Sequence, residues 1–284
     1  MSSNELLGTC LCETVRWRVA GQLTPFAHCH CSICRKSHGT PFATYMAANA
    51  QDVHWLSGED AITRFESSPG FNRQFCKHCG SVVPGVASDG HMFVPPGCAD
   101  VDPGVRAKIH LFVNEKVPWH EITDSLRQFD AFPNSAGPET LYTGTPDTVS
   151  DALSGSCACG GIAFEVMAPL TVARNCHCTR CRRGRSAPHA SNGFASSEAV
   201  QFVRGEDLLV DYKVPEAQFF TQTFCRQCGS LMPRVSQERG VANIPMGSLD
   251  GQPNITPGGH IYTKHKAPWH EITDALPQFP EGAN

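Results

Sequence analysis

The feature that most constrains this chain is a cysteine motif that occurs twice in its 284 residues. The motif reads CHCSICR from Cys29 to Arg35 and returns as CHCTRCR from Cys176 to Arg182. Three cysteines within six residues can reach one metal ion from a tight loop, and zinc readily takes thiolate ligands. The repeated motif therefore indicates two metal sites built on the same plan.

Two further cysteine pairs accompany each motif. A Cys-x-Cys pair precedes it by 16 residues in both places (13–28 and 160–175), and a Cys-x-x-Cys-Gly sequence follows it. Each half closes with the same heptapeptide, PWHEITD. This agreement indicates an internal duplication. We expect one zinc domain over 5–132 and a second over 153–281, joined by a linker at 133–152 that is rich in Pro, Gly, Ser and Thr.

The composition argues against several classes of protein. A formal net charge of −4 gives no reason to expect nucleic-acid binding. Charges, Gly and Pro interrupt every apolar run, so we expect no membrane span. The first residues lack the charged start and apolar run of a signal peptide. We therefore expect the 15 cysteines to be reduced and the protein to be cytoplasmic.

The sequence between the motifs has the pattern of short strands. Apolar and polar residues alternate over 14–19 and, more loosely, over 161–166, as in a half-buried strand. Further strands are expected over 43–48, 53–56, 61–66, 71–75, 91–94 and 108–113. No helical stripe is sustained over about ten residues, although a turn of helix fits after each three-cysteine motif. The predicted fold class is mainly β.

The seven repeated cysteines of each half divide into a set of four and a set of three. The four can close a structural zinc site that ties an early strand to a late hairpin. These sets are Cys10, Cys12, Cys76 and Cys79, and Cys157, Cys159, Cys225 and Cys228. The sets of three are Cys29, Cys31 and Cys34, and Cys176, Cys178 and Cys181. Three protein ligands leave one exchangeable position, as in a catalytic zinc site, so we expect about four zinc ions per chain.

Other uses of these cysteines stay open at this point. Free cysteines are common core residues and can also oxidise in pairs, although spacing reproduced in both halves favours metal ligation. A fourth ligand from elsewhere would turn a three-cysteine set into a second structural site. An iron–sulfur cluster is less favoured, because seven cysteines do not divide into two sets of four.

The succession of Gly-x-Cys-x-Cys, Cys-His-Cys-x-x-Cys-Arg, Phe-Cys-x-x-Cys-Gly and a final Pro-Trp resembles the glutathione-dependent formaldehyde-activating enzyme family, which includes the centromere-protein-V-like domains. The resemblance implies two tandem β-tent domains of short antiparallel sheets. It also implies a structural zinc on each set of four cysteines and a catalytic zinc on each set of three. The activity that it implies is a carbon–sulfur lyase reaction, in which glutathione and formaldehyde combine reversibly.

The implied chemistry has a physical reason. A thiol reacts as its thiolate, so zinc that binds the sulfur favours deprotonation and holds it beside the carbonyl. We predict a zinc-dependent lyase that acts on the adduct of glutathione, or another thiol, with formaldehyde or a related carbonyl compound. The alternative is a non-catalytic zinc module that binds a protein partner.

Several neighbouring side chains are weaker candidates. Arg35 and Arg182 follow the third cysteine and could donate to a zinc-bound thiolate or a substrate carboxylate, with a surface or structural salt bridge as the equal alternative. His30 and His177 lie between two ligands, so their rings are expected to turn away from the metal. Cys98 has no counterpart in the repeat and is expected to be a small packed residue.

The closing heptapeptides do not form a zinc-protease motif. After His120 and His270, Asp124 and Asp274 occupy the place where that motif requires a second histidine. The tryptophans of the two heptapeptides are expected to be core anchors or the edge of a pocket.

The two halves differ beside the motif. Phe42 of the first half corresponds to His189 of the second. We expect the first half to contain the working site, and we consider His189 as a possible fourth ligand that closes the second site.

Overall fold

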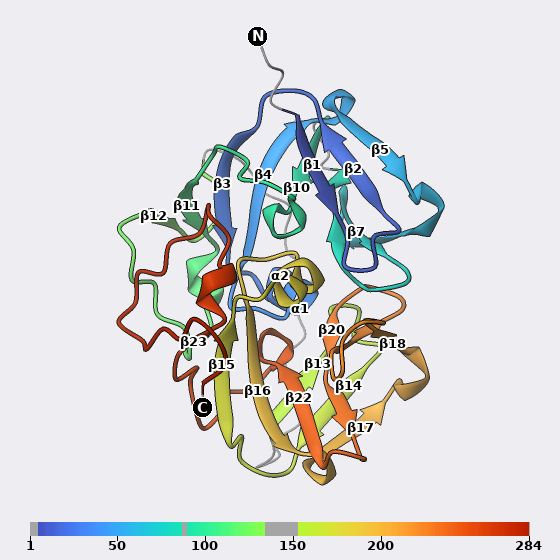
Figure 1. Ribbon diagram of the computed structural model, residues 1–284, viewed down its shortest axis with the longest axis vertical. Coiled ribbons are helices and arrows are strands. Elements are labelled where there is room, and N and C mark those ends of the chain that lie inside the picture. The colour runs from blue at the N-terminus through green and yellow to red at the C-terminus, as the bar shows by residue number, and fades with distance from the viewer. Residues whose placement is uncertain (1–4, 87–89, 134–152, 284) are drawn as a thin grey trace.

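The structure is a computed structural model that describes residues 5–86, 90–133 and 153–283. Within these residues the strands form six sheets, three in each half of the chain. Figure 1 shows the first half above the second, with the two α-helices between them. The predicted linker, apart from Pro133, lies outside the described residues, and the boundaries at 5–132 and 153–281 stay a prediction.

The first half contains two three-stranded sheets and one of six strands. One small sheet has the order β1 (Leu6–Thr9), β2 (Arg16–Val19), β5 (Val53–Ser57), and the other β6 (Ile62–Ser68), β7 (Phe71–Cys76), β8 (Val82–Val83). The large sheet has the order β12 (Arg127–Phe129), β11 (Ala107–Leu111), β3 (Thr24–Cys29), β4 (Ala43–Asn49), β10 (His91–Val94), β9 (Gly85–Val86).

The second half repeats this arrangement. Its small sheets have the orders β13 (Leu153–Ser156), β14 (Ala163–Val166), β17 (Val200–Arg204) and β18 (Leu209–Lys213), β19 (Thr221–Cys225), β20 (Leu231–Met232). The large sheet has the order β21 (Arg234–Ser236), β22 (Val241–Pro245), β16 (Ala190–Ser196), β15 (Val172–Cys176), β23 (His260–Ile261).

The mainly β fold predicted from the sequence is confirmed. Each strand predicted from the sequence is present, and none of its ends is shifted by more than two residues. Most neighbouring strands are antiparallel, as expected. The large sheets also contain parallel pairs, β11 with β3 and β12, and β15 with β23. These pairs bring the end of each half back beside its three-cysteine motif.

The helices begin inside the cysteine motifs rather than after them. They are α1 (Ser32–His38) and α2 (Thr179–Arg185). The second cysteine of each motif is the N-cap, since Cys31 Sγ accepts a hydrogen bond from the Cys34 N–H, and Cys178 Sγ from the Cys181 N–H. The third cysteine therefore lies on the first turn of a helix, close to the second.

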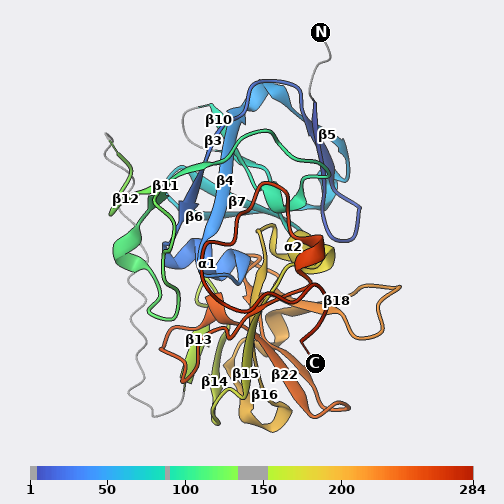
Figure 2. The same ribbon diagram turned by 60° about the vertical axis from the view of Figure 1, so that its left-hand side comes forward.

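The two halves share their interior, although the sequence predicted two successive domains. Trp269 of the second heptapeptide is buried in a core cluster with Trp17 and Val94 of the first half. Trp119 belongs to a cluster that contains Phe164 and other second-half residues. Figure 2 shows the red C-terminal chain rising beside the first half. The tryptophans are core anchors, as predicted, but they join the two halves together.

One buried ion pair also joins the halves. Lys36 on α1 is fully buried, and its Nζ lies 2.6 Å from a carboxylate oxygen of Asp250 and 2.5 Å from the Ser156 hydroxyl oxygen. A charged amine is placed in an interior only when it is paired, because desolvation of an isolated charge is costly. This pair therefore couples the first helix to the second half.

None of the helices in the described ranges has the length and apolar character needed to cross a membrane.

Candidate metal centres and active site

Each set of four cysteines comes together as predicted from its spacing. In the first half the Sγ atoms of Cys10 and Cys12 are 3.5 Å apart, and those of Cys12 and Cys76 are 3.6 Å apart. The corresponding distances in the second half are 3.4 Å between Cys157 and Cys159, and 3.9 Å between Cys159 and Cys225. All four sulfurs of each set lie within 4.8 Å of one another.

This geometry fits a tetrahedral thiolate site. Metal–sulfur bonds of about 2.3 Å in a tetrahedron place neighbouring sulfurs roughly 3.8 Å apart. A disulfide would require about 2.05 Å, and all the cysteines are free. The donor set therefore matches a structural metal site in each half.

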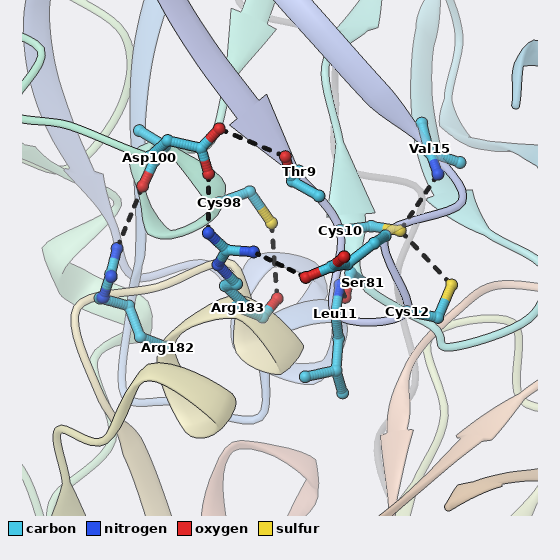
Figure 3. A network of polar contacts seen from close by, with 12 residues as sticks. Thr9, Cys10, Leu11, Cys12, Val15, Ser81, Cys98, Asp100, Arg182 and Arg183 are labelled. Carbon is cyan, nitrogen blue, oxygen red and sulfur yellow. Dashed lines mark hydrogen bonds and ion pairs between the residues drawn. The ribbon is translucent and has the colours of Figure 1, made fainter. Parts of the chain in front are cut away.

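The surrounding backbone supports a set of thiolates. In Figure 3 the Val15 N–H points to Cys10 Sγ, with the nitrogen 3.3 Å from the sulfur. Ser81 Oγ accepts a hydrogen bond from the Leu11 N–H at 3.1 Å, which holds the first cysteine loop against the second. Ser230 accepts the equivalent bond from Ala158 in the second half, at 2.9 Å. Hydrogen-bond donors directed at a cysteine sulfur favour the thiolate over the neutral thiol.

The three-cysteine set of the first half is buried at the junction of β3 and α1. Cys29 ends the strand, Cys31 caps the helix and Cys34 lies on its first turn. Cys29 and Cys31 have their sulfurs 3.5 Å apart, and all three sulfurs lie within 4.8 Å of one another. The set could hold a metal ion with three protein ligands.

A cavity of about 270 Å³ opens onto these three cysteines. Its walls come from the large sheet and from β7, with Phe71, Phe93 and Phe112 among the lining residues. A three-ligand site beside an open cavity can admit a further molecule, whereas a closed four-ligand site cannot. This cavity therefore distinguishes the three-cysteine set of the first half as a candidate active site.

Arg73 on β7 reaches this site from outside the cysteine motif. Its guanidinium lies 3.4 Å from Cys34 Sγ and 3.0 Å from the Tyr45 hydroxyl oxygen. Burial works against the charge of Arg73, but Cys34 and Tyr45 outweigh this effect and hold its pKa well above the ordinary value. The side chain therefore supplies a permanent positive charge beside the sulfurs.

Tyr45 is fixed by a second partner. His38 Nδ1 lies 2.6 Å from the Arg185 carbonyl, which can only accept, so Nδ1 carries the proton. Nε2 of His38 then accepts from the Tyr45 hydroxyl at 2.6 Å. Burial lowers the pKa of His38 to about 3, which keeps the ring neutral and this direction of bonding unchanged.

The second half uses different residues around its three cysteines. Gln222 stands where the first half has Arg73, and it bonds to the carbonyls of Cys79 and Gly184. Arg185 stands where the first half has His38, and it bonds to Asn192 at 3.1 Å. Burial lowers the pKa of Arg185 to about 10, against the opposing effect of Cys181 and Cys176. A guanidinium thus lies near each set of sulfurs, from Arg73 on a strand in the first half and from Arg185 on a helix in the second.

The weaker candidates have different outcomes. Arg182 donates to the carbonyls of Gly97 and Ala99 in the first half, which is a structural role between the halves. Figure 3 shows Arg182 and Arg183 side by side near Asp100. Arg35 is buried on α1, and a role at the metal stays a prediction. Cys98 is fully buried against Ser186, as expected for a packed residue, and burial raises its pKa to about 12.

His30 and His177 form a relay with residues that the sequence did not single out as partners. His110 Nε2 lies 3.1 Å from the Asp124 carboxylate, so His110 Nδ1 accepts from His30 Nε2 at 2.8 Å. His177, His260 and Asp274 repeat the arrangement, with distances of 2.8 and 3.0 Å. The rings are thus engaged away from the sulfurs, in agreement with the sequence prediction.

His189 does not join the second three-cysteine set. Its ring lies 5.2 Å from that of His177 and 5.7 Å from that of His270, and the three sulfurs are grouped without it. It lines a cavity of about 820 Å³ between the halves, together with both heptapeptides. Burial lowers the pKa of His189 to about 3, and His260 and His120 add to this effect. The idea that His189 closes the second site is therefore not supported.

The sequence reasoning missed Arg73, Tyr45 and the two His–Asp pairs. Comparison of the halves could have indicated the first two, because Gln222 and Asn192 stand at their places in an otherwise matching register. The His–Asp pairs were harder to find, since 14 residues separate the partners and only the parallel pairing at the end of each half brings the histidine to the cysteine motif.

A family model of the glutathione-dependent formaldehyde-activating enzyme matches residues 5–115 and 152–265. The chain belongs to this family. The two matched regions agree with the tandem repeat that the sequence predicted, and they account for most of the chain.

Two similar proteins match shorter stretches. A Halomonas elongata protein, named provisionally as a glutathione-dependent formaldehyde-activating enzyme, is 29% identical over 143 residues, which cover 46% of this chain and 90% of that protein. An uncharacterized lyase of Schizosaccharomyces pombe is 28% identical over 79 residues, covering 28% of this chain and 56% of its own. A solved Rhodobacter sphaeroides protein is 27% identical, with a TM-score of 0.29 and coverage of 37% of this chain and 98% of that one.

Proposed function

We propose that this protein is a zinc-dependent carbon–sulfur lyase that acts on the adduct of a thiol, glutathione or another, with formaldehyde or a related carbonyl compound. The observation that carries the proposal is the cavity that opens onto Cys29, Cys31 and Cys34. Family membership and the names of the two relatives support the reaction class. The working site is assigned to the first half.

The donor chemistry favours zinc at all four cysteine sets. Three or four thiolates in a compact group suit zinc, and seven cysteines per half do not divide into the two sets of four that iron–sulfur clusters would use. Cys29, Cys31 and Cys34 would hold the ion of the working site. When bound there, zinc supplies a positive centre that lowers the pKa of an incoming thiol.

The reaction moves one proton and forms one bond. In the synthetic direction the thiol sulfur bonds to the carbonyl carbon, the thiol proton is lost, and the carbonyl oxygen gains a proton to become a hydroxyl. In the lyase direction the C–S bond breaks, and the thiol and the carbonyl compound are restored. The protein must therefore hold two small reactants together and stabilise negative charge, first on sulfur and then on oxygen.

Arg73 is suited to stabilise the negative charge that develops during the reaction. Its guanidinium is held by Tyr45 and by Cys34, so its charge stays at the cavity wall without reorganisation during the reaction. The Tyr45 hydroxyl proton is already donated to His38, so Tyr45 is not available to donate it to the reactants. We assign Arg73 as a positioning and charge-stabilising residue.

Turnover of thiol and aldehyde mixtures by the purified protein tests the proposal. We expect Cys31→Ser to abolish turnover and Cys178→Ser to retain most of it. Arg73→Gln, which installs the residue of the second half, should reduce kcat/KM by about 10- to 100-fold. Arg64→Gln on the neighbouring strand is the matched control and should change little. Absence of turnover with every mixture would favour a non-catalytic zinc module.

A further inference from the structure

We infer that the first-half site accepts a thiol or aldehyde with an uncharged aromatic or branched aliphatic group, rather than glutathione. This inference rests on the proposed function and names the substrate class of the same site. Its basis is the aromatic, nearly uncharged wall of the cavity. A charged tripeptide would need more charged partners than this wall offers, and the corresponding wall in the second half has different residues.

The wall of the cavity is a continuous series of aromatic rings. Tyr45 contacts Phe93 at 5.9 Å between ring centroids, and Phe93 stacks on Phe71 at 6.2 Å. Phe71 stacks on Phe132 at 6.4 Å, and Phe132 meets Phe112 edge to face at 5.2 Å. Rings that contact one another in this way form a rigid apolar surface, to which a further ring can add by stacking or by an edge contact.

Charge is scarce in this cavity. Among the described lining residues, Arg73 is the one with a charged side chain apart from the cysteines, and it already contacts Cys34 and Tyr45. The exposed lining residues, Thr24 and Pro25, are uncharged. Glutathione has two carboxylates and one ammonium group at neutral pH. An ionised group that loses water without gaining a partner is strongly disfavoured.

The volume fits a small apolar molecule. An apolar cavity of about 150 Å³ is large enough for benzene, so about 270 Å³ accommodates one ring with a short arm. Such an arm would place a sulfur or carbonyl carbon beside the three cysteines while the ring rests on Phe93 and Phe71. The volume of the cavity therefore suits an arylmethyl thiol better than a tripeptide.

The second half keeps only part of this wall. Phe220 and Tyr262 retain aromatic rings at the positions of Phe71 and Phe112. Asn192 stands in place of Tyr45, and Asn243 in place of Phe93. Phe93 pairs with Ala47 across β10 and β4, and Asn243 pairs with Phe194 across β22 and β16, so the two positions correspond in register. Phe93→Asn thus introduces a residue that the same sheet position already accepts in the other half.

The test uses the zinc-loaded full chain with two reactive and two unreactive probes. Formaldehyde is supplied with phenylmethanethiol or with glutathione, and adduct formation and cleavage are followed by NMR. Binding of benzyl methyl sulfide and of S-methylglutathione, which cannot react, is measured by calorimetry. We expect kcat/KM with phenylmethanethiol to exceed that with glutathione by at least about tenfold, and benzyl methyl sulfide to bind more tightly than S-methylglutathione.

Phe93→Asn should reduce the preference for the aromatic compound over its glutathione counterpart by about tenfold, both in turnover and in binding. Phe219→Asn, at an exposed ring in the second half, is the control and should leave it unchanged. A preference for glutathione in both measurements would overturn this inference while leaving the lyase function intact. Tight binding of benzyl methyl sulfide without turnover of either thiol would instead remove the lyase function and retain the ligand class. No binding of benzyl methyl sulfide would overturn the inference.

Discussion

Phe75 and Phe224, which occupy equivalent positions in the two halves, meet with their ring centroids 6.3 Å apart and their planes inclined by 74°. Each ring also covers the glycine that ends the Cys-x-x-Cys-Gly sequence of the other half. A Cβ atom on Gly80 would lie 2.5 Å from Phe224, and one on Gly229 would lie 2.6 Å from Phe75. The metal loops are thus shaped by the opposite half as well as by their own turns.

This relationship predicts a large effect of Gly80→Ala. The left-handed backbone at φ +73° costs about 1–2 kcal/mol for alanine, and displacement of a buried ring adds about 1–3 kcal/mol. We expect the free energy of unfolding to fall by about 3 kcal/mol in denaturant titrations. Gly104→Ala is the control, because it has φ +75° with open space around it and should show the backbone cost alone. Equal losses in the two variants would contradict the contact with Phe224.

The buried pair of Lys36 and Asp250 predicts strong coupling between the halves. Lys36→Met leaves the Asp250 carboxylate largely buried without its partner, and we expect a loss of about 3–5 kcal/mol in the free energy of unfolding. The double variant Lys36→Met/Asp250→Leu should recover much of this loss, because no unpaired charge remains. Lys264→Met, which removes an exposed pair with Glu281, should change stability by about 1 kcal/mol or less. A double variant that is no more stable than Lys36→Met would count against this account.

The low pKa of His189 predicts that the folded protein loses stability in mild acid. Its pKa is about 3 in the folded protein, mainly because of burial, whereas an unfolded histidine has a pKa of about 6.5. The unfolded chain therefore binds a proton first, and stability present above about pH 6.5 falls as the pH is lowered toward 3. At pH 5 this one residue should cost about 2 kcal/mol.

His189→Phe tests this acid effect with the residue that the first half has at the same position. Its stability should depend less on pH between 6.5 and 5 than that of the wild type, as measured by denaturant titration at each pH. His265→Phe, at an exposed histidine, serves as the control. Parallel pH curves for His189→Phe and the wild type would show that His189 does not carry the effect.

Metal analysis of the purified protein should give about four zinc ions per chain, and Cys31→Ser should give about three. Cys98→Ser should leave the count at four, since Cys98 packs against Ser186 and serine occupies the equivalent position, Ser248. Chelation should lower the thermal midpoint of unfolding, because the metal binding energy contributes to folding. A count of two in the wild type would remove metal from the three-cysteine sets and, with it, the proposed reaction.

The sequence was sufficient to predict the local parts of this fold. Alternation of apolar and polar residues identified strands such as Arg16–Val19, because a strand buried on one face requires that pattern. Cysteine spacing predicted which sulfurs come together, since the two pairs of each four-cysteine set belong to tight loops. The sequence also allowed a turn of helix after each motif, but it did not indicate that the second cysteine would be the N-cap.

The candidate site was predicted only in part. The three cysteines are neighbours in sequence, so their grouping needed no tertiary information. Arg73 lies 39 residues from Cys34, and only the tertiary structure brings its guanidinium from β7 to the sulfur. His189 lies eight residues after Cys181 and was considered as a ligand, yet the strand that follows directs it into the space between the halves. Proximity in sequence therefore missed the contact of Arg73 with Cys34 and wrongly suggested His189 as a ligand.

What the sequence by itself determined is the repeat, the mainly β class and the two kinds of cysteine set. These follow from residue type and short spacing, which act within a few residues of the chain. The tertiary structure alone decided that each heptapeptide tryptophan anchors a core shared with the other half. It also decided that Arg73, Tyr45 and Phe93 line the cavity at the three cysteines of the first half. Such contacts depend on the packing of surfaces that are distant in sequence. The charge and shape of each neighbouring side chain are then set by a different part of the chain.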